Sequence, residues 1–377
     1  MDLTLLLSIL AGIVLLLILI LKLRIPAFIS LLISSIVVGI LAGMQPKIIV
    51  DTVISGMGNT LGFVATVVGL GAMFGAILEK TGGARSIAAT LLKSFGTKRS
   101  PWAMALTGFV VAIPVFFDVA FIILVPVIYA LQKSSSKSLL AYAMPLLAGL
   151  GITHAFIPPT PGPVAVAEIL QADLGWVILA GLIAGIPTLL VSGIWFGKRI
   201  SRTIFLEAPE GHEQEEQSTD LPKAAGIFAI IGFPILLIIL ATLIRSEVLP
   251  SGGLSKWSEL IGHPITALIL ANLIAWYDLG LKRGFTSKQL LEITGKSLAP
   301  AGTIILLTGA GGVFKEMLIA TGGGKMMAES LTSLGIPLIL FAFLAAAIIR
   351  VLQGSATVAM ITGAGLVAPL LLETNLA

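Results

Sequence analysis

The strongest candidate for a binding site is a proline-rich break that follows a long apolar run. The stretch reads Gly151-Ile-Thr-His-Ala-Phe-Ile-Pro-Pro-Thr-Pro-Gly-Pro163. Proline cannot continue a helix, so the helix must end here and expose backbone N–H groups that attract anions. The hydroxyls of Thr153 and Thr160 and the imidazole of His154 are therefore candidates to bind the hydroxyls and carboxylate of a small organic acid. The alternative is a loop at a membrane surface, with His154 as a packing residue.

Asp118 is a candidate proton carrier, because it lies alone between two apolar segments in Ile113-Pro-Val-Phe-Phe-Asp-Val-Ala120. A carboxylate in a partly dry environment is costly to ionise, which suits a group that takes up and releases a proton. A second interpretation, compatible with the first, makes Asp118 the N-cap of the helix that follows. His154 is a further titratable candidate for proton coupling.

Arg350 is a candidate ligand for a substrate carboxylate, because it stands in an apolar stretch and a guanidinium matches the geometry of a carboxylate. Ser355 and Thr357, at the start of the next apolar arm, add hydroxyl donors. The alternative is that Arg350 forms a structural pair with an acid such as Glu316. Glu316 itself is either a proton-coupling residue facing a cavity or a polar residue near the end of a span, and its neighbour Lys315 points about 100° away from it on a helix.

These residues belong to a chain that must be surrounded largely by lipid. Of its 377 residues, 57% are hydrophobic and 11% are charged, whereas soluble domains carry roughly 25% charged residues. The absence of cysteine excludes thiolate metal sites, and three histidines far apart disfavour a histidine metal site, so no metal or other cofactor is expected. The sequence lacks the basic stripe of a nucleic-acid binder, the nucleophile and base of an enzyme, and the large extramembrane domain of a receptor.

Apolar stretches long enough to cross a hydrocarbon layer of about 30 Å predict an all-α polytopic membrane protein. The first stretch is preceded by Asp2 and is too long for the apolar core of a signal peptide, so we interpret it as a retained span. The predicted spans are 3–21, 25–45, 57–78, 139–157, 175–196, 224–244, 263–279 and 299–319.

Two further apolar regions, 101–131 and 336–373, are interrupted near their middle by polar or turn-forming residues. Lys and Arg collect in cytoplasmic loops. Placing the N-terminus outside puts most basic residues inside, but only if 101–131 enters and leaves on the cytoplasmic side. We therefore predict a re-entrant hairpin there, which requires surrounding protein or a water-filled cavity. The loops placed inside are 22–24, 80–99, 133–137, 198–223 and 282–296.

Segment 71–83 is similar to segment 311–323, and the charge map makes the two corresponding spans cross the membrane in opposite directions. Six of the 13 positions are identical. Two similar units of opposite orientation are typical of inverted-repeat transporters. The identical pairs are Gly71/Gly311, Phe74/Phe314, Leu78/Leu318, Thr81/Thr321, Gly82/Gly322 and Gly83/Gly323.

This repeat predicts the domain organisation. The first inverted repeat is 1–197, with its re-entrant hairpin at about 101–131 and a broken helix at about 139–170. A polar cytoplasmic linker follows at 198–222. The second repeat is 223–377, with its hairpin at about 336–373. Glycine pairs four residues apart, such as Gly71/Gly75 and Gly181/Gly185, predict close approach between helices.

At these motifs the chain resembles the gluconate:proton symporter family of bacterial permeases, within the ion-transporter superfamily. The resemblance covers nearly the whole chain, and its most specific part is the His-Ala-Phe-x-Pro-Pro-x-Pro-Gly-Pro pattern that begins at His154. The stretches that carry it are Leu78-Glu-Lys-Thr-Gly-Gly-Ala84, Ile113–Ala120, Gly151–Pro163 and Gln353-Gly-Ser-Ala-Thr-Val-Ala359.

The resemblance implies a homodimer that imports gluconate or a similar sugar acid with protons across the bacterial inner membrane, using separate scaffold and transport domains. Family members continue into a last broken helix with a His-Val-Asn-Asp-Ser-type motif, whereas this sequence ends at Ala377, so the second repeat is expected to be incomplete. Two alternatives stay open: a sodium-coupled carboxylate carrier of the same architecture, and a D-serine or hydroxy-acid permease of the same family.

Overall fold

The computed structural model describes residues 3–135, 137–209, 221–249, 255–324, 326–327, 333 and 335–373, and these residues form helices and connecting turns without a strand. Residues 210–220 of the predicted linker, Lys325 and the C-terminal residues 374–377 lie outside the described residues. The chain folds into two compact units. Unit 1 comprises 1–66, 161–172 and 300–377, and unit 2 comprises 67–160 and 173–299.

Each of the eight predicted spans is found as a helix. Seven helical segments of the described chain are long and apolar enough to cross a membrane, and the remaining predicted span is a helix of only 15 residues, Ala27–Leu41. The corresponding helices are α1 (Leu3–Leu17), α2 (Ala27–Leu41), α3 (Pro46–Lys80), α7 (Leu140–Phe156), α9 (Leu174–Thr188), α11 (Ala224–Arg245), α13 (Pro264–Ala275) and α14 (Ser287–Ala320).

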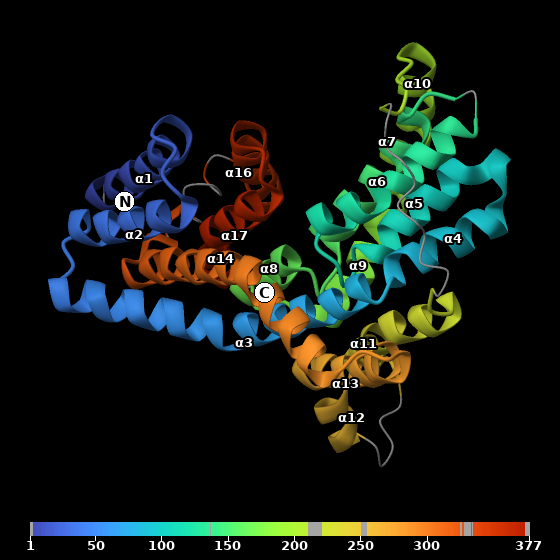
Figure 1. Ribbon diagram of the computed structural model, residues 1–377. Coiled ribbons are helices and arrows are strands. Elements are labelled where there is room, and N and C mark those ends of the chain that lie inside the picture. Colours follow the sequence, from blue (N-terminus) through green and yellow to red (C-terminus); the bar gives the residue numbers. More distant parts are fainter. Residues whose placement is uncertain are drawn as a thin grey trace. The chain divides into compact units, whose positions relative to one another are not determined.

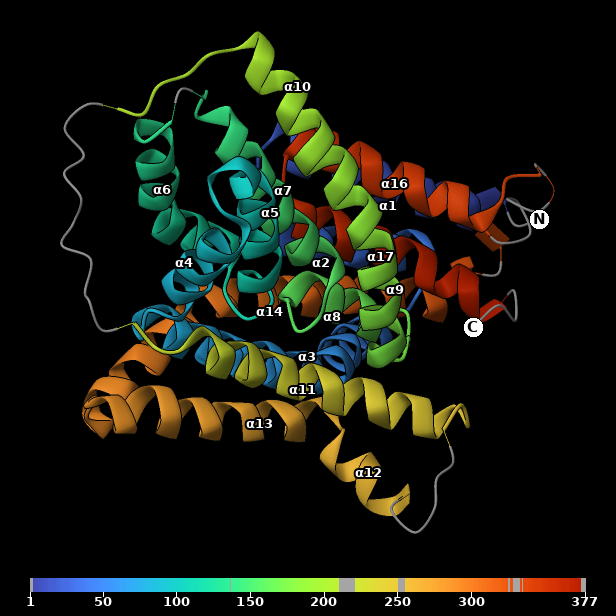
Figure 2. The same ribbon diagram turned by 90° about the vertical axis from the view of Figure 1, so that its right-hand side faces the viewer.

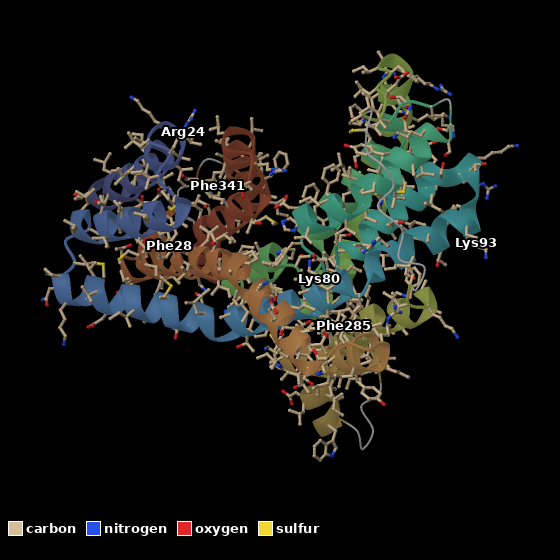
Figure 3. All side chains as sticks on the ribbon, in the orientation of Figure 1. Arg24, Phe28, Lys80, Lys93, Phe285 and Phe341 are labelled. Atoms are coloured by element: carbon tan, nitrogen blue, oxygen red, sulfur yellow. The ribbon has the colours of Figure 1, made fainter. Side chains whose placement is uncertain are left out.

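Several helices were not predicted as spans, because they are short or carry charge on one face. In α4 (Gly83–Phe95), Ile87 and Ala88 are buried while Lys93 points away from the helix bundle (Figure 3). A polar face of this kind suppresses the mean hydropathy of the segment. The others are α8 (Pro161–Ile169), α10 (Phe196–Thr203) and α12 (Ser255–Ile261).

Unit 1 packs the helix pair α1–α2 and the helix pair α16 (Leu338–Gln353) and α17 (Ala356–Glu373) around one apolar core (Figure 1). Phe314 of α14 is fully buried in this core. Phe28 of α2 and Phe341 of α16 pack against it (Figure 3). Helix α17 also lies against α8, so unit 1 combines segments that are far apart in the sequence.

Unit 2 is centred on α7, which packs most closely against α5 (Ser100–Val111). Gly108 and Gly149 make this approach possible, since a Cβ at either position would overlap the backbone of the facing helix. Helices α11 and α13 lie side by side (Figure 2). The two units thus take segments from both predicted repeats, and the division at 197 and 223 stays a prediction.

The two segments matched in the sequence end their helices in the same way. Thr81 and Thr321 each donate a side-chain hydrogen bond to the carbonyl four residues earlier, at 2.8 Å and 3.0 Å. Gly82 and Gly322 then adopt left-handed backbone conformations with φ of 80° and 74°, which glycine tolerates without a Cβ penalty. This shared local structure explains why Thr-Gly-Gly recurs, and the opposite orientation of the two segments stays a prediction.

Both predicted hairpins consist of two helices joined by a break. In the first, α5 is followed by α6 (Phe117–Lys133). With 12 and 17 residues, these arms are about 18 Å and 26 Å long at 1.5 Å per residue, both shorter than a hydrocarbon core of about 30 Å. In the second hairpin, Gly354 at φ 78° ends α16 and Ser355 precedes α17.

The ends of the predicted linker are hydrogen-bonded to unit 2. The backbone N–H of Leu139 donates to the carbonyl of Leu206 at 2.8 Å, and the hydroxyl of Ser138 donates to the carbonyl of Ile204 at 2.9 Å. At the other end, the Ser86 hydroxyl donates to the carbonyl of Pro222. These contacts hold the start of the linker, after α10, and its end, before α11, against unit 2.

Candidate functional site

The residues predicted to contact substrate or protons form two groups, one in each compact unit. Unit 2 holds Asp118, Thr153, His154 and Thr160, and unit 1 holds Glu316, Arg350, Ser355 and Thr357. In unit 2 the structure places His154 against Phe117, the residue before Asp118, whereas in unit 1 Glu316 lines a cavity to which Arg350, Ser355 and Thr357 do not contribute. That the two groups share one substrate stays a prediction.

The proline-rich break lies between α7 and α8, as the sequence predicts. Thr153 is fully buried, and its hydroxyl donates to the carbonyl of Phe109 at the end of α5, at 2.7 Å. The hydroxyl of Thr160 donates to the carbonyl of Ile157 at 2.6 Å. Both hydroxyl protons are therefore used inside the protein, and these oxygens remain available only as acceptors.

His154 and the start of the first hairpin's second arm are neighbours. The imidazole packs against the ring of Phe117, with ring centroids 6.3 Å apart and the ring planes inclined by 53°. Asp118 follows Phe117 in the first turn of α6 and is exposed. The N-cap of α6 is Phe116, so the interpretation of Asp118 as the N-cap is wrong. A carboxylate in the first helical turn is still favoured by the helix dipole.

Helix α3 passes close to both breaks of unit 2 through two glycines. A Cβ at Gly75 would overlap the carbonyl of Pro114 in the hairpin break, and a Cβ at Gly71 would lie 3.5 Å from the carbonyl oxygen of Pro159. Gly75 therefore allows a close approach, but its partner is a non-helical segment rather than the helix that the sequence predicted, and the contact at Gly71 is an ordinary one. Small residues are required where backbone packs on backbone.

Arg350 caps its own helix rather than forming an ion pair. One guanidinium nitrogen, Nη1, donates to the carbonyl of Gly354, and the side chain is exposed. Among the described residues no ion pair joins Arg350 to Glu316, so the expected structural pair is not formed. Ser355 accepts a hydrogen bond from the backbone N–H of Val358 at 3.4 Å, which places its hydroxyl at the start of α17.

Glu316 lines a polar cavity of about 350 Å³ that lies within unit 1. Six polar side chains and two glycines surround it, and the contributing elements are α3, the end of α8 with the turn that follows, and α14. Lys315 also lines this cavity, so both members of the adjacent charged pair reach it. The lining residues are Gly56, Asn59, Thr60, Glu168, Gln171, Gly312, Lys315 and Glu316.

The floor of this cavity is formed where α3 and α14 touch. A Cβ at Gly312 would overlap the hydroxyl of Thr60, and a Cβ at Gly56 would lie 2.8 Å from the Cα of Val313. Sequence reasoning singled out Glu316 but missed Asn59, Glu168 and Gln171. Glu168 carried a usable signal, since a carboxylate so close to an apolar broken helix is unusual.

A polar cluster around Asp173 in unit 2 has a structural role. Asp173 is the N-cap of α9 and accepts hydrogen bonds from the backbone N–H groups of Gly175 and Trp176 at 2.9 Å and 3.2 Å. It also accepts from the hydroxyl of Thr242 at 2.7 Å and pairs with Arg245 at 2.7 Å. This cluster joins α9 to α11.

Comparison with known sequences gives a consistent result. A profile described as GntP family permease matches residues 4–377. A low-affinity gluconate transporter of Escherichia coli is 41% identical over 375 residues, which cover 99% of this chain and 84% of that protein. A gluconate permease of Pseudomonas aeruginosa is 41% identical over 339 residues, 89% of this chain and 75% of that protein. The Gnt-II system L-idonate transporter of Escherichia coli is 37% identical over 376 residues, 98% of this chain and 84% of that protein.

Among solved structures, the YdaH transporter of Alcanivorax borkumensis is similar, with a TM-score of 0.52 and 17% sequence identity. The match covers 86% of this chain and 73% of that one. At this level of identity the similarity describes the fold alone.

Proposed function

Because this chain belongs to the GntP family of permeases, we propose that it imports gluconate or a closely related sugar acid together with protons across the bacterial inner membrane. The family assignment confirms the resemblance found in the motifs, and it makes the chain a multi-pass membrane transporter rather than an enzyme. The sugar-acid substrate, the coupling to protons and the orientation in the membrane are what we propose.

The observation that carries the substrate assignment is the 41% identity to a gluconate transporter over 99% of the chain. Gluconate and L-idonate, the substrates named for the relatives, are both polyhydroxy acids, so the substrate class is an anion with several hydroxyl groups. Such a ligand needs a cationic or dipolar partner for its carboxylate and several hydrogen-bonding groups for its hydroxyls. In unit 1 the start of α17 beside Ser355, together with the exposed Arg350, supplies groups of this kind, whereas the start of α8 beside Thr160 is buried.

Proton coupling is proposed for Asp118, His154 and Glu316. Asp118 and His154 are neighbours through Phe117, which supports a shared role at the first hairpin. Glu316 lies in a polar cavity of unit 1. An ionisable residue within a membrane-spanning segment is expensive to place there, and it is retained where it serves a transported ion or proton.

We further propose that the chain consists of two inverted repeats, with the N-terminus outside, and that it acts as a homodimer. The identical ends of α3 and α14 at Thr-Gly-Gly support an internal repeat. The distribution of lysine and arginine supports opposite orientations and the external N-terminus. The inner membrane follows from the same cytoplasmic excess of basic residues in a bacterial permease family.

Uptake by reconstituted vesicles tests this proposal. Purified protein in liposomes should accumulate labelled gluconate when the external solution is acidic, and a protonophore should abolish the accumulation. A sodium gradient in place of the proton gradient should have no effect. A requirement for sodium, or a failure to transport any hydroxy acid, would overturn the proposal, and preferential uptake of D-serine would reassign the substrate.

An Asp118→Asn variant sharpens the test of proton coupling. It should lose accumulation driven by the pH gradient while still exchanging internal for external gluconate, because exchange needs no net proton movement. Asp278→Asn is the matched control, since Asp278 forms a surface ion pair with Lys282 four residues away. Normal gradient-driven accumulation by Asp118→Asn would remove this residue from the coupling mechanism.

A further inference from the structure

The cavity of unit 1 contains a combination of groups that its packing does not require. Lys315, Glu316 and Glu168 all line it. Among the described residues, no hydrogen bond or ion pair within 4 Å is formed by the side chains of Lys315 and Glu316. Lys315 interacts electrostatically with Glu168, but charges that form no close pair within membrane-spanning helices are costly unless they serve a ligand or an ion. We therefore interpret these charges as groups that serve the cavity rather than groups that stabilise the fold of unit 1.

Comparing the matched segments 71–83 and 311–323 distinguishes the residues of α14 that pack the helix from those that line the cavity. Phe314 and Leu318 match Phe74 and Leu78, and all four side chains are buried, so these positions maintain the shared helix packing. In the same register, Lys315 occupies the position of Gly75. Gly75 packs against the carbonyl of Pro114, whereas Lys315 reaches a cavity. The packing pattern common to both segments does not need a charged pair, so the pair is specific to the cavity.

Gln171 also takes an unfavourable conformation to reach the cavity. It ends the helical segment after Glu168 with φ of 55°, in the left-handed region that favours glycine. Its side-chain amide donates to the carbonyl of Glu168 at 2.7 Å and also lines the cavity. Non-glycine residues are uncommon in this region, so the position combines an unfavourable backbone conformation with a side chain that lines the cavity.

We propose that this cavity is a binding site for a polyhydroxy carboxylate, in which the ammonium of Lys315 holds the carboxylate and the side chains of Asn59, Thr60 and Gln171 bind hydroxyls. Glu168 and Glu316 accept hydrogen bonds from further hydroxyls. A volume of about 350 Å³ lies at the lower end of small-molecule sites, about 300–1,000 Å³. The ligand class rests on the proposed function, whereas the cavity and its lining do not.

The sum of the charges that line the cavity connects binding of the anion to the transport of a proton. The titratable groups that face the cavity are Glu168 from α8 and Lys315 and Glu316 from α14, and α3 contributes only Asn59 and Thr60. The ionised cavity therefore carries one excess negative charge, and a bound carboxylate would add a second. Binding of the anion therefore calls for a compensating positive charge, which symport with one proton would supply. With the N-terminus outside, the cavity lies toward the external side, where α3 begins and α14 ends.

Site-directed labelling tests the proposal directly, because the chain has no cysteine. Gln171 is an exposed residue of the cavity lining, and the Gln171→Cys variant places a reactive thiol there. Intact cells that carry this variant are treated with a membrane-impermeant maleimide, with and without gluconate. At a gluconate concentration ten times the Kd, the labelling rate should fall about tenfold, since mass action leaves about one site in eleven empty. Lys47→Cys, on α3 but outside the cavity lining, should label at a rate that gluconate does not change.

Second-site variants identify the role of Lys315. Adding Lys315→Gln to Gln171→Cys should reduce protection at the same gluconate concentration from about tenfold to about twofold or less, because loss of a charge-assisted hydrogen bond weakens binding about tenfold or more. Lys296→Gln is the control on the same helix, since Lys296 forms a surface pair with Glu292. Unchanged labelling of Lys47→Cys in the Lys315→Gln background would show that the protein remains folded.

A calorimetric titration with gluconate in buffers of different ionisation enthalpy measures how many protons are taken up for each bound anion. We expect an uptake of about one proton per bound anion at the cavity, reduced in the double variant Glu168→Gln with Glu316→Gln. Labelling that gluconate does not slow, in a protein that still transports gluconate, would overturn the cavity site while leaving the transport function intact. Protection by another hydroxy acid, without gluconate transport, would support the site and overturn the substrate assignment.

Discussion

Gly75 of α3 lies directly against the carbonyl group of Pro114, so that a side chain at position 75 would overlap the break between the two arms of the first hairpin. This contact fixes the hairpin break, and with it Phe117 and Asp118, against a long helix. The position of the break therefore depends on the absence of a single methyl group at residue 75.

The Gly75→Ala variant should lose stability and transport together. Overpacking of this kind typically costs about 1–3 kcal/mol, because either α3 or the hairpin break must move. Gly58→Ala in the same helix is the control, since nothing lies within 4 Å of a Cβ at that position, and its helix should be stabilised by roughly 0.5–1 kcal/mol. Thermal unfolding in detergent, followed by uptake in vesicles, measures both effects. Equal melting temperatures for the two variants would contradict the close contact.

Thr153 joins the proline-rich break to the hairpin through its hydrogen bond to the carbonyl of Phe109. Thr153→Val keeps the shape and removes the donor, so it should lower stability by about 1 kcal/mol. Thr153→Ser keeps the donor and should retain most of the transport rate. Comparison of gluconate KM for the two variants separates the structural bond from a direct contact with substrate. A large rise in KM for Thr153→Ser alone would indicate that the methyl group, not the hydroxyl, is what matters.

Asp173 should contribute more stability than any ion pair on the exposed helix surfaces. It accepts two backbone hydrogen bonds as an N-cap and a third bond from Thr242. Asp173→Ala should therefore cost about 1–3 kcal/mol, while the partly exposed Arg245 adds little of this because water screens the pair. Asp278→Ala is the comparison, and it should cost no more than about 0.5 kcal/mol. Similar unfolding midpoints for the two variants would refute the capping role.

Arg350 should affect transport more than stability, because its side chain is exposed and its guanidinium donates to the carbonyl at the end of its own helix. We expect Arg350→Gln to lower gluconate transport at least about tenfold, and Arg350→Lys to restore part of it, since an ammonium supplies charge without the bidentate geometry of a guanidinium. Arg199→Gln, at another exposed arginine, is the control. Wild-type transport by Arg350→Gln would leave the residue with a capping role only.

The sequence alone determined the helices long and apolar enough to cross a membrane, the helix breaks within 101–131 and 336–373, the proline-rich break and the family. These features follow from local physics: the bilayer sets the length of an apolar run, and proline and glycine end helices wherever they stand. The amphipathic helix α4 was missed because its charged face lowers the mean hydropathy. The N-cap of α6 was assigned to Asp118 although Phe116 occupies that position, since a boundary error of two residues is within the resolution of sequence patterns.

Only the tertiary structure decided which distant residues meet. Glu168 and Gln171 share a cavity with Lys315 and Glu316, and with Asn59 from a third segment, although no pattern within any one segment indicates the others. Such encounters depend on how glycines such as Gly56 and Gly312 let two helices touch, which is a property of paired surfaces. Hydropathy and breaking residues act along one chain segment at a time, whereas a site is built where segments cross, and that crossing is fixed by packing.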